Sequence, residues 1–189
     1  MKKTHLLFIL FVFTAIFLTT NKHSYAETVP NPVGDIYVQD FAKILSAAQK
    51  KELIKLGTYL DKESEAQIAV LTVNSLEKAP IGEFASKALK EYELGSQTED
   101  NGVLLLFSLN DRKIYIEVGS GLKDRLNDKV IGKILDTHAL PYLENGELSQ
   151  AITNTYKKLF NEVGAEYKLK KSVKTESFEY GYNDGKGRW

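Results

Sequence analysis

The chain has 189 residues, with 25 basic and 25 acidic side chains and no cysteine. This length is that of one domain, and we expect a monomer. A balanced charge gives no general attraction to nucleic acid, so we expect no nucleic-acid partner. Without cysteine the chain cannot form a disulfide, a thiolate metal site or a lipid-modified cysteine anchor, and it lacks a thiol nucleophile.

The first 26 residues have the three parts of a signal peptide. Two lysines precede the apolar run 6–18, and the small-residue segment 24–26 follows it. An uncleaved membrane anchor is the alternative, but this run is short for a span. We therefore expect cleavage after Ala26, an exported or extracytoplasmic product, and no further transmembrane helix.

The next elements alternate between strand and helix patterns. Residues 36–38 resemble a short edge strand, and Ser46 with Gln49 forms a capping-box pattern before an amphipathic helix that reaches about Lys62. The apolar segment 67–73 predicts a buried strand. Pro80 then opens a second helix, which Gly95 ends.

The segment 101–122 predicts a β-hairpin. Its first strand, 103–107, is wholly apolar, as in a strand buried on both faces, whereas 113–118 alternates apolar and polar residues. A tight turn at Asn110 and Asp111 joins them. With Leu109 paired to Arg112, the register sets Leu104 opposite Glu117 and Gly102 opposite Gly119.

Two further helices follow, one capped by Asn127 or Asp128 and interrupted by Pro141, the other starting near Glu147. Helices between buried strands predict parallel, right-handed connections. We therefore expect an α/β fold, a three-layer α/β/α sandwich whose mixed sheet has parallel strands plus one antiparallel hairpin strand. This domain would span 27–167. Residues 168–189 would form a loosely ordered basic and aromatic tail, or else an adhesive arm.

The sequence offers carboxylate and carbonyl oxygens as possible ligands for a metal site. Near one end of the expected sheet they surround the loop Gly119, Ser120 and Gly121, and carboxylates without basic partners repel one another unless a cation joins them. Such ligands suit Ca²⁺, and Mg²⁺ less well. The alternative is that each carboxylate is a helix cap, a turn residue or a solvated charge. The candidate metal ligands are Asp40, Asp100, Asn101, Glu117 and Asp128.

Several other chemistries are excluded. After removal of the signal peptide His138 is the only histidine, so we expect no histidine zinc site and take His138 as structural. The turn at Gly119 lacks the third glycine of a dinucleotide fingerprint, since Asp124 stands at that position, and there is no Walker A motif. We expect no bound nucleotide.

The chain resembles the TPM domain family, which includes thylakoid acid-phosphatase-like proteins and exported bacterial proteins. The similarity covers about 33–167. It rests on five ordered motifs, YVQDFAKILS, QIAVLTVNSL, DNGVLLLFSLNDRKIYIEVGSGL, LNDKVIGKIL and LPYLENGELSQAI. The resemblance implies an α/β/α sandwich outside the cytoplasm, with an acidic patch at Asp40, Asp100, Glu117 and Asp128. The chain departs from the family at Ser120, where members often carry tyrosine between the glycines.

Two functions remain open. Family members include phosphatases, calcium-binding proteins and accessory factors for membrane complexes. One expectation is therefore a calcium-binding accessory or assembly module that docks on an envelope or membrane complex. The alternative is a metal-assisted acid phosphatase, with a cation on Asp100 and Glu117, although only Lys123 and Arg125 offer positive charge for a phosphate.

Overall fold

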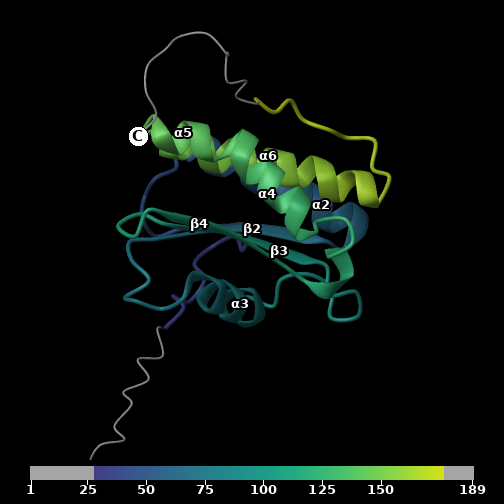
Figure 1. The fold of residues 1–189 in the computed structure, drawn as a ribbon. Helices are drawn as coiled ribbons and strands as arrows, with labels where there is room; N and C mark the ends of the chain where they lie inside the picture. The colour runs from purple at the N-terminus through teal and green to yellow at the C-terminus, as the bar shows by residue number, and fades with distance from the viewer. Residues whose placement is uncertain (1–27, 177–189) are drawn as a thin grey trace, which may run out of the picture.

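The computed structural model describes residues 28–176 and shows one sheet between two unequal layers of helices (Figure 1). The predicted signal peptide therefore lies outside the described residues. Four strands form the sheet in the order β1-β2-β3-β4. β1, β2 and β3 are parallel, and β4 is antiparallel to β3. The strands are β1 Val38–Asp40, β2 Gln67–Val73, β3 Gly102–Ser108 and β4 Lys113–Val118.

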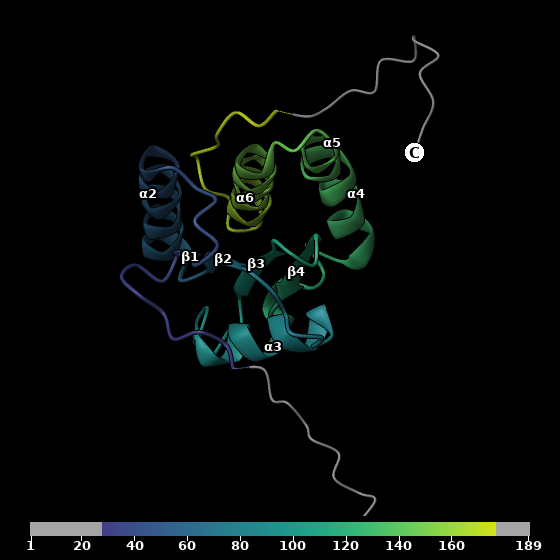
Figure 2. The ribbon, with the colours of Figure 1, turned by 90° about the vertical axis from the view of Figure 1, so that its left-hand side faces the viewer.

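The helices divide between the two faces of the sheet (Figure 2). The single helix α3, Ile81–Glu91, covers one face, and the other helices cover the opposite face. These are α2 Ala47–Ser64, α4 Asp128–His138, α5 Leu140–Glu144 and α6 Leu148–Glu166. The predicted three-layer α/β/α sandwich with a mixed sheet is confirmed. No helix within residues 28–176 is long and apolar enough to cross a membrane.

Strand alternation divides the core into two clusters. In β3, Val103, Leu105 and Phe107 pack toward α2 and α6, whereas Leu104 and Leu106 pack toward α3. Each of these side chains is essentially fully buried. Because full burial of such a side chain contributes roughly 1.5–3 kcal/mol, β3 is the centre of the fold, as its apolar run predicts.

Local signals set most helix ends. Ser46 and Gln49 form the predicted capping box at the start of α2, and Asn127 caps α4 by accepting from the Val130 amide. α3 ends at Glu91, earlier than the predicted stop at Gly95, because Glu93 already has a positive φ. Pro141 does not merely interrupt a helix, since it lies in the first turn of α5.

The chain beyond α6 is placed differently from our expectation of a loose arm starting at Lys168. Residues 168–176, here called the strap, run back over the outer side of the helical layer (Figure 1). Lys168 has a φ of 55°, and the Leu169 amide donates to the Gly164 carbonyl at 2.8 Å, so α6 ends in a left-handed turn. Leu169 and Val173 then pack against the core. The remainder of the predicted tail, 177–189, lies outside the described residues.

Candidate functional site

The hairpin gathers one group of predicted site residues at a single end of the sheet. Leu104 pairs with Glu117, and the Gly119 amide donates to the Gly102 carbonyl at 2.8 Å. This is the predicted register. Gln67 pairs with Gly102 from the other side, so β2 also starts at this end. Asp100, Asn101, Glu117 and the glycine turn are thus neighbours, as expected.

Residues 99–101, here called the acidic loop, close onto the glycine turn. The Ser120 amide donates to Asp100 Oδ2 at 2.7 Å, and the Gly121 amide donates to the Asp100 carbonyl at 3.0 Å. The hydrogen bonds from Ser120 outweigh burial and hold the pKa of Asp100 below its usual range. Asp100 adopts this arrangement with a φ of 47°, a strained value for a residue with a side chain.

Two glycines make this closure possible. A Cβ added to Gly119 would lie 2.1 Å from the Asp100 carbonyl oxygen, and one added to Gly121 would lie 1.9 Å from the Glu99 carbonyl oxygen. Both distances are far inside van der Waals contact with backbone atoms. The turn therefore needs glycine because two backbone segments touch there.

Asn101 has a structural role and is not available to a ligand at the surface. Its side chain is fully buried, Oδ1 accepts from the Ser96 amide at 2.8 Å, and Nδ2 donates to the Tyr167 hydroxyl at 2.8 Å. These bonds fix the acidic loop against the end of α6. We therefore leave Asn101 out of the ligand set proposed below.

Asp40 does not join this group. It is the last residue of β1, whereas Asp100 precedes the parallel strand β3, so the two lie at opposite ends of the sheet. The Asp40 side chain is 1 % exposed and forms a 2.7 Å ion pair with Lys50. It also accepts from the Thr72 hydroxyl and from the Ile44 and Leu45 amides. Its placement in one acidic patch with Asp100 is wrong.

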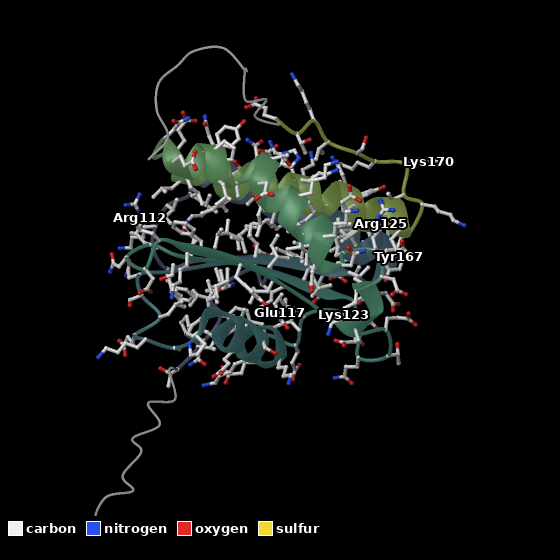
Figure 3. The ribbon with its side chains drawn as sticks, viewed as in Figure 1. Arg112, Glu117, Lys123, Arg125, Tyr167 and Lys170 are labelled. Atoms are coloured by element: carbon white, nitrogen blue, oxygen red, sulfur yellow. The ribbon has the colours of Figure 1, made fainter. Side chains whose placement is uncertain are left out.

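A cleft of about 430 Å³ opens between β4 and the start of α4. It is lined by Glu117 and Asp128, both predicted ligands, and by Lys123, Tyr115 and Asn127 among others. Figure 3 shows Lys123 at the opposite end of β4 from Arg112, which marks the hairpin turn. The structure thus brings Glu117 and Asp128 to one surface, although they are separated in sequence and lie on different elements.

Burial acts directly on Glu117. Desolvation raises the pKa of its carboxyl group, and this exceeds the opposing effects of Lys123, a hydrogen bond with Ser86, and Lys90. Tyr115, beside it, also has a raised pKa, because of burial first and then the charges of Glu117 and Asp128. Burial therefore disfavours the ionised forms of Glu117 and Tyr115 at this cleft.

The two predicted cations behave differently. Lys123 lines the cleft, but Arg125 forms a 2.6 Å ion pair with Glu162 on α6. Tyr115 was missing from the sequence-based site, and the only available signal was its place two residues before Glu117 on the same strand. Within residues 28–176 no three acidic or histidine side chains converge as a ready metal centre.

His138 is consistent with the expected structural role. It is buried near the end of α4, and its Nδ1 lies 3.0 Å from the Glu176 carbonyl oxygen, at the end of the strap. Burial lowers the pKa of its ring, ahead of the opposing hydrogen bond with Glu176. The histidine therefore ties the strap to α4.

Together the fold and the glycine-bounded acidic end define a small α/β/α domain of the type expected from the sequence. The model of the TPM domain family matches residues 38–162. The chain belongs to the TPM domain family. A search of curated proteins gave no match.

Solved structures of other proteins share this fold. One is the solution structure of the N-terminal domain of a protein from P. gingivalis, with a TM-score of 0.66 and 22 % identity, covering 74 % of this chain and 89 % of that one. Another is the BA42 protein of the psychrophilic bacterium Bizionia argentinensis, with a TM-score of 0.56, 16 % identity and coverage of 67 % and 86 %. A third is the N-terminal domain of the cg2496 protein of Corynebacterium glutamicum, with a TM-score of 0.51, 12 % identity and coverage of 82 % and 94 %. At these identities the likeness establishes the fold alone.

Proposed function

We propose that this protein is an exported binding module of the cell envelope whose ligand cleft takes up Ca²⁺. The observation that supports this most is that Glu117 and Asp128 both line one cleft of about 430 Å³. Two carboxylates on one surface favour a hard cation with oxygen ligands. No nucleophilic cysteine is available, and the one histidine in the described residues is buried elsewhere, so a binding role fits the side chains best.

The donor set fits calcium, but only for weak binding. Glu117 and Asp128 supply carboxylate oxygens, and Asp100 stands beside the glycine turn with one carboxylate oxygen held by Ser120. Because no third acidic side chain completes a centre within residues 28–176, water would supply several ligands. Sites of this kind bind calcium with dissociation constants of about 10⁻⁴–10⁻³ M, as in extracellular modules. Mg²⁺, which demands stricter octahedral geometry, fits less well.

A bound cation would also relieve a cost that the fold carries. Burial disfavours the ionised form of Glu117, and Lys123 and Lys90 offset this only in part. A divalent cation between Glu117 and Asp128 would favour both ionised groups. A partner on an envelope or membrane complex could then complete the coordination, which makes docking dependent on calcium.

The test is titration of residues 27–189 with CaCl₂ and with MgCl₂, followed by amide NMR and thermal melting. We expect saturable shifts at 117–121 and 127–128, and a rise in melting temperature with calcium. Glu117→Gln combined with Asp128→Asn should abolish both. Asp136→Asn is the matched control, because Asp136 is an exposed acid on α4 outside the lining of the cleft. If the double variant showed the same amide shifts and the same rise in melting temperature with calcium, the proposal would be contradicted.

A second function, phosphomonoester hydrolysis, is favoured by one specific observation. Lys123 and the partly buried Glu117 line the same cleft, and the raised pKa of Glu117 suits a general acid. Lys123 would hold the phosphate while water attacks phosphorus and the P–O bond to the alkoxide breaks. Glu117 would donate its proton to the departing alkoxide, and the proton lost by the attacking water would return to Glu117. A divalent cation, when bound, would polarise the phosphate oxygens.

Turnover of p-nitrophenyl phosphate between pH 4 and 8, with and without calcium, tests this second function. Glu117→Gln should then lower kcat by about 10²–10⁴, while Asp136→Asn should leave it unchanged. Absence of turnover in the wild-type protein under all these conditions, or equal turnover in Glu117→Gln, excludes the mechanism.

A further inference from the structure

The strap is an extended segment with two distinct sides. Its odd-numbered residues, from Leu169 to Thr175, are half-buried, and its even-numbered residues are exposed. Asn161 on α6 holds it with two hydrogen bonds to Val173, in which Nδ2 donates to the carbonyl at 2.8 Å and the amide donates to Oδ1 at 2.9 Å. Lys171 lies over the Tyr59 ring, 4.5 Å from its centroid. The strap is thus fixed in register on the helices.

This register sends three lysines outward. Lys168, Lys170 and Lys174 are exposed, and none forms an ion pair with any acid in the part of the chain that the structure describes. An extended chain rises about 3.3 Å per residue, so Lys170 and Lys174 are roughly 13 Å apart along the strap, and Lys168 precedes them in the left-handed turn that ends α6. Lys170 lies on the outer side of the helical layer, away from the sheet (Figure 3).

The acidic residues near Lys168, Lys170 and Lys174 do not neutralise these lysines. Glu162, on the helix beneath them, is already paired with Arg125 and Lys158. Exposed Glu166 and Glu176 stand only near the two ends of the strap. Without the signal peptide the chain has 22 basic and 25 acidic residues, so the molecule as a whole is not attracted to anions. Any anion binding by the strap therefore comes from a local array of charge.

The sequence that follows the strap indicates which anionic partner fits. Residues 177–189 contain two basic residues, two acidic residues and four aromatic residues, of which one is Trp189. Basic residues followed by tryptophan and tyrosine are typical of segments at a lipid–water interface. Three exposed lysines along one surface segment suit a layer of phosphates better than one buried ligand.

We propose that the strap docks this protein on the surface of an anionic lipid bilayer, with Lys168, Lys170 and Lys174 on the lipid phosphates. This inference goes beyond the proposed calcium site and uses different residues. The two proposals can therefore fail separately. The Glu117 cleft lies at β4, away from the outer side of the helical layer. Docking through the strap would therefore leave this cleft available to a second partner.

The experiment uses residues 27–189 in EDTA, so that calcium cannot join carboxylates to lipid. Vesicles contain phosphatidylcholine alone or mixed with phosphatidylglycerol, and binding is measured by co-sedimentation. Trp189 is the only tryptophan of the chain, so a blue shift of its emission reports arrival of the tail at the interface. We expect binding to the anionic vesicles alone and its loss at high salt.

Three matched variants decide the role of the strap. Each basic side chain near an anionic surface strengthens binding about fivefold, so Lys168→Gln, Lys170→Gln and Lys174→Gln together should weaken it about a hundredfold. The control combines Lys78→Gln, Lys113→Gln and Lys129→Gln, which are equally exposed and change the net charge equally. Deletion of 177–189 should weaken binding less than the strap variant.

Three outcomes would overturn the proposal. The first is equal loss in the two triple variants, which would indicate net charge alone. The second is loss on deletion of the tail with no loss in the strap variant. The third is binding to soluble polyphosphate without binding to anionic vesicles, which would indicate a polymer partner. Because all six lysines are exposed, an unchanged urea midpoint in each variant confirms that folding is intact.

Discussion

The side-chain amide of Asn101 joins the acidic loop to Tyr167, the residue directly after α6, with its Nδ2 2.8 Å from the Tyr167 hydroxyl oxygen. Since Tyr167 directly precedes the strap, this hydrogen bond connects the end of the sheet that carries the candidate site with the segment that crosses the helices. Asn101→Leu should therefore lower the free energy of unfolding by about 2–4 kcal/mol, because the Ser96 amide and the Tyr167 hydroxyl lose a buried partner. Urea denaturation measures this. Tyr167→Phe, which removes one bond, should cost about 1 kcal/mol.

The close backbone contact at the glycine turn gives a prediction with an internal control. Gly121→Ala would place a Cβ 1.9 Å from the Glu99 carbonyl oxygen, so the acidic loop must move, at a cost of about 2–4 kcal/mol. Gly132→Ala, within α4, meets nothing within 4 Å and should instead stabilise by about 0.5–1 kcal/mol. Chemical denaturation and the amide shifts of 99–101 check both. A Gly121→Ala variant as stable as the wild-type protein would contradict the close backbone contact at this turn.

Asp40 should contribute to the acid sensitivity of the fold. Burial alone would raise its pKa, but hydrogen bonds from Lys50, Thr72 and two backbone amides outweigh burial and lower it. A carboxyl group whose pKa is lower in the folded state stabilises above its unfolded pKa of about 3.9, and this contribution disappears as pH falls through the folded value. Asp40→Asn should therefore cost about 1–3 kcal/mol at pH 7 and much less near pH 2. Melting temperatures across this range provide the measurement.

Glu117 should show the opposite dependence. Burial, the largest effect, raises its pKa despite Lys123, so its contribution is favourable below its unfolded pKa and is lost as pH rises through the folded value. Glu117→Gln should therefore leave stability nearly unchanged at pH 4 and raise it at pH 7, in metal-free buffer. A variant that is less stable at pH 7 would show that the carboxylate has a favourable partner in the fold.

The core offers a simple test of the layer assignment. Leu105 is fully buried on the α2 and α6 side of β3, and Leu105→Ala should cost about 2–5 kcal/mol. Leu143→Ala, on the partly buried α5, should cost much less. Thermal melting of both variants distinguishes a central β3 from a peripheral one.

The hairpin register and the neighbourhood of Asp100 and Glu117 could be predicted because they depend on alternation and on one tight turn. The error at Asp40 was avoidable. Asp40 is the last residue of β1, whereas Asp100 precedes the parallel strand β3, and this difference alone places them at opposite ends of the sheet. Asp128 reaches the Glu117 cleft because α4 packs against α6 and begins near β4, and the sequence has no local signal for that placement.

The strap escaped prediction for a different reason. Its inward positions include Lys171, which lies over an aromatic ring, so the alternation is not one of apolar and polar residues. Its anchor, Asn161, is separated from Val173 by a helix end and a left-handed turn. Contacts of this kind depend on the finished surface of α6. They cannot be read from periodicity.

The burial of β3 between two neighbouring strands has a consequence for hydrogen exchange. Amides of β3, such as that of Leu105, should exchange with solvent only when the whole domain unfolds, and their rates report its global free energy. The Ser120 amide, bonded to an exposed Asp100, should exchange through local opening of the turn. One exchange experiment would therefore separate ligands that tighten only this turn from those that stabilise the entire fold.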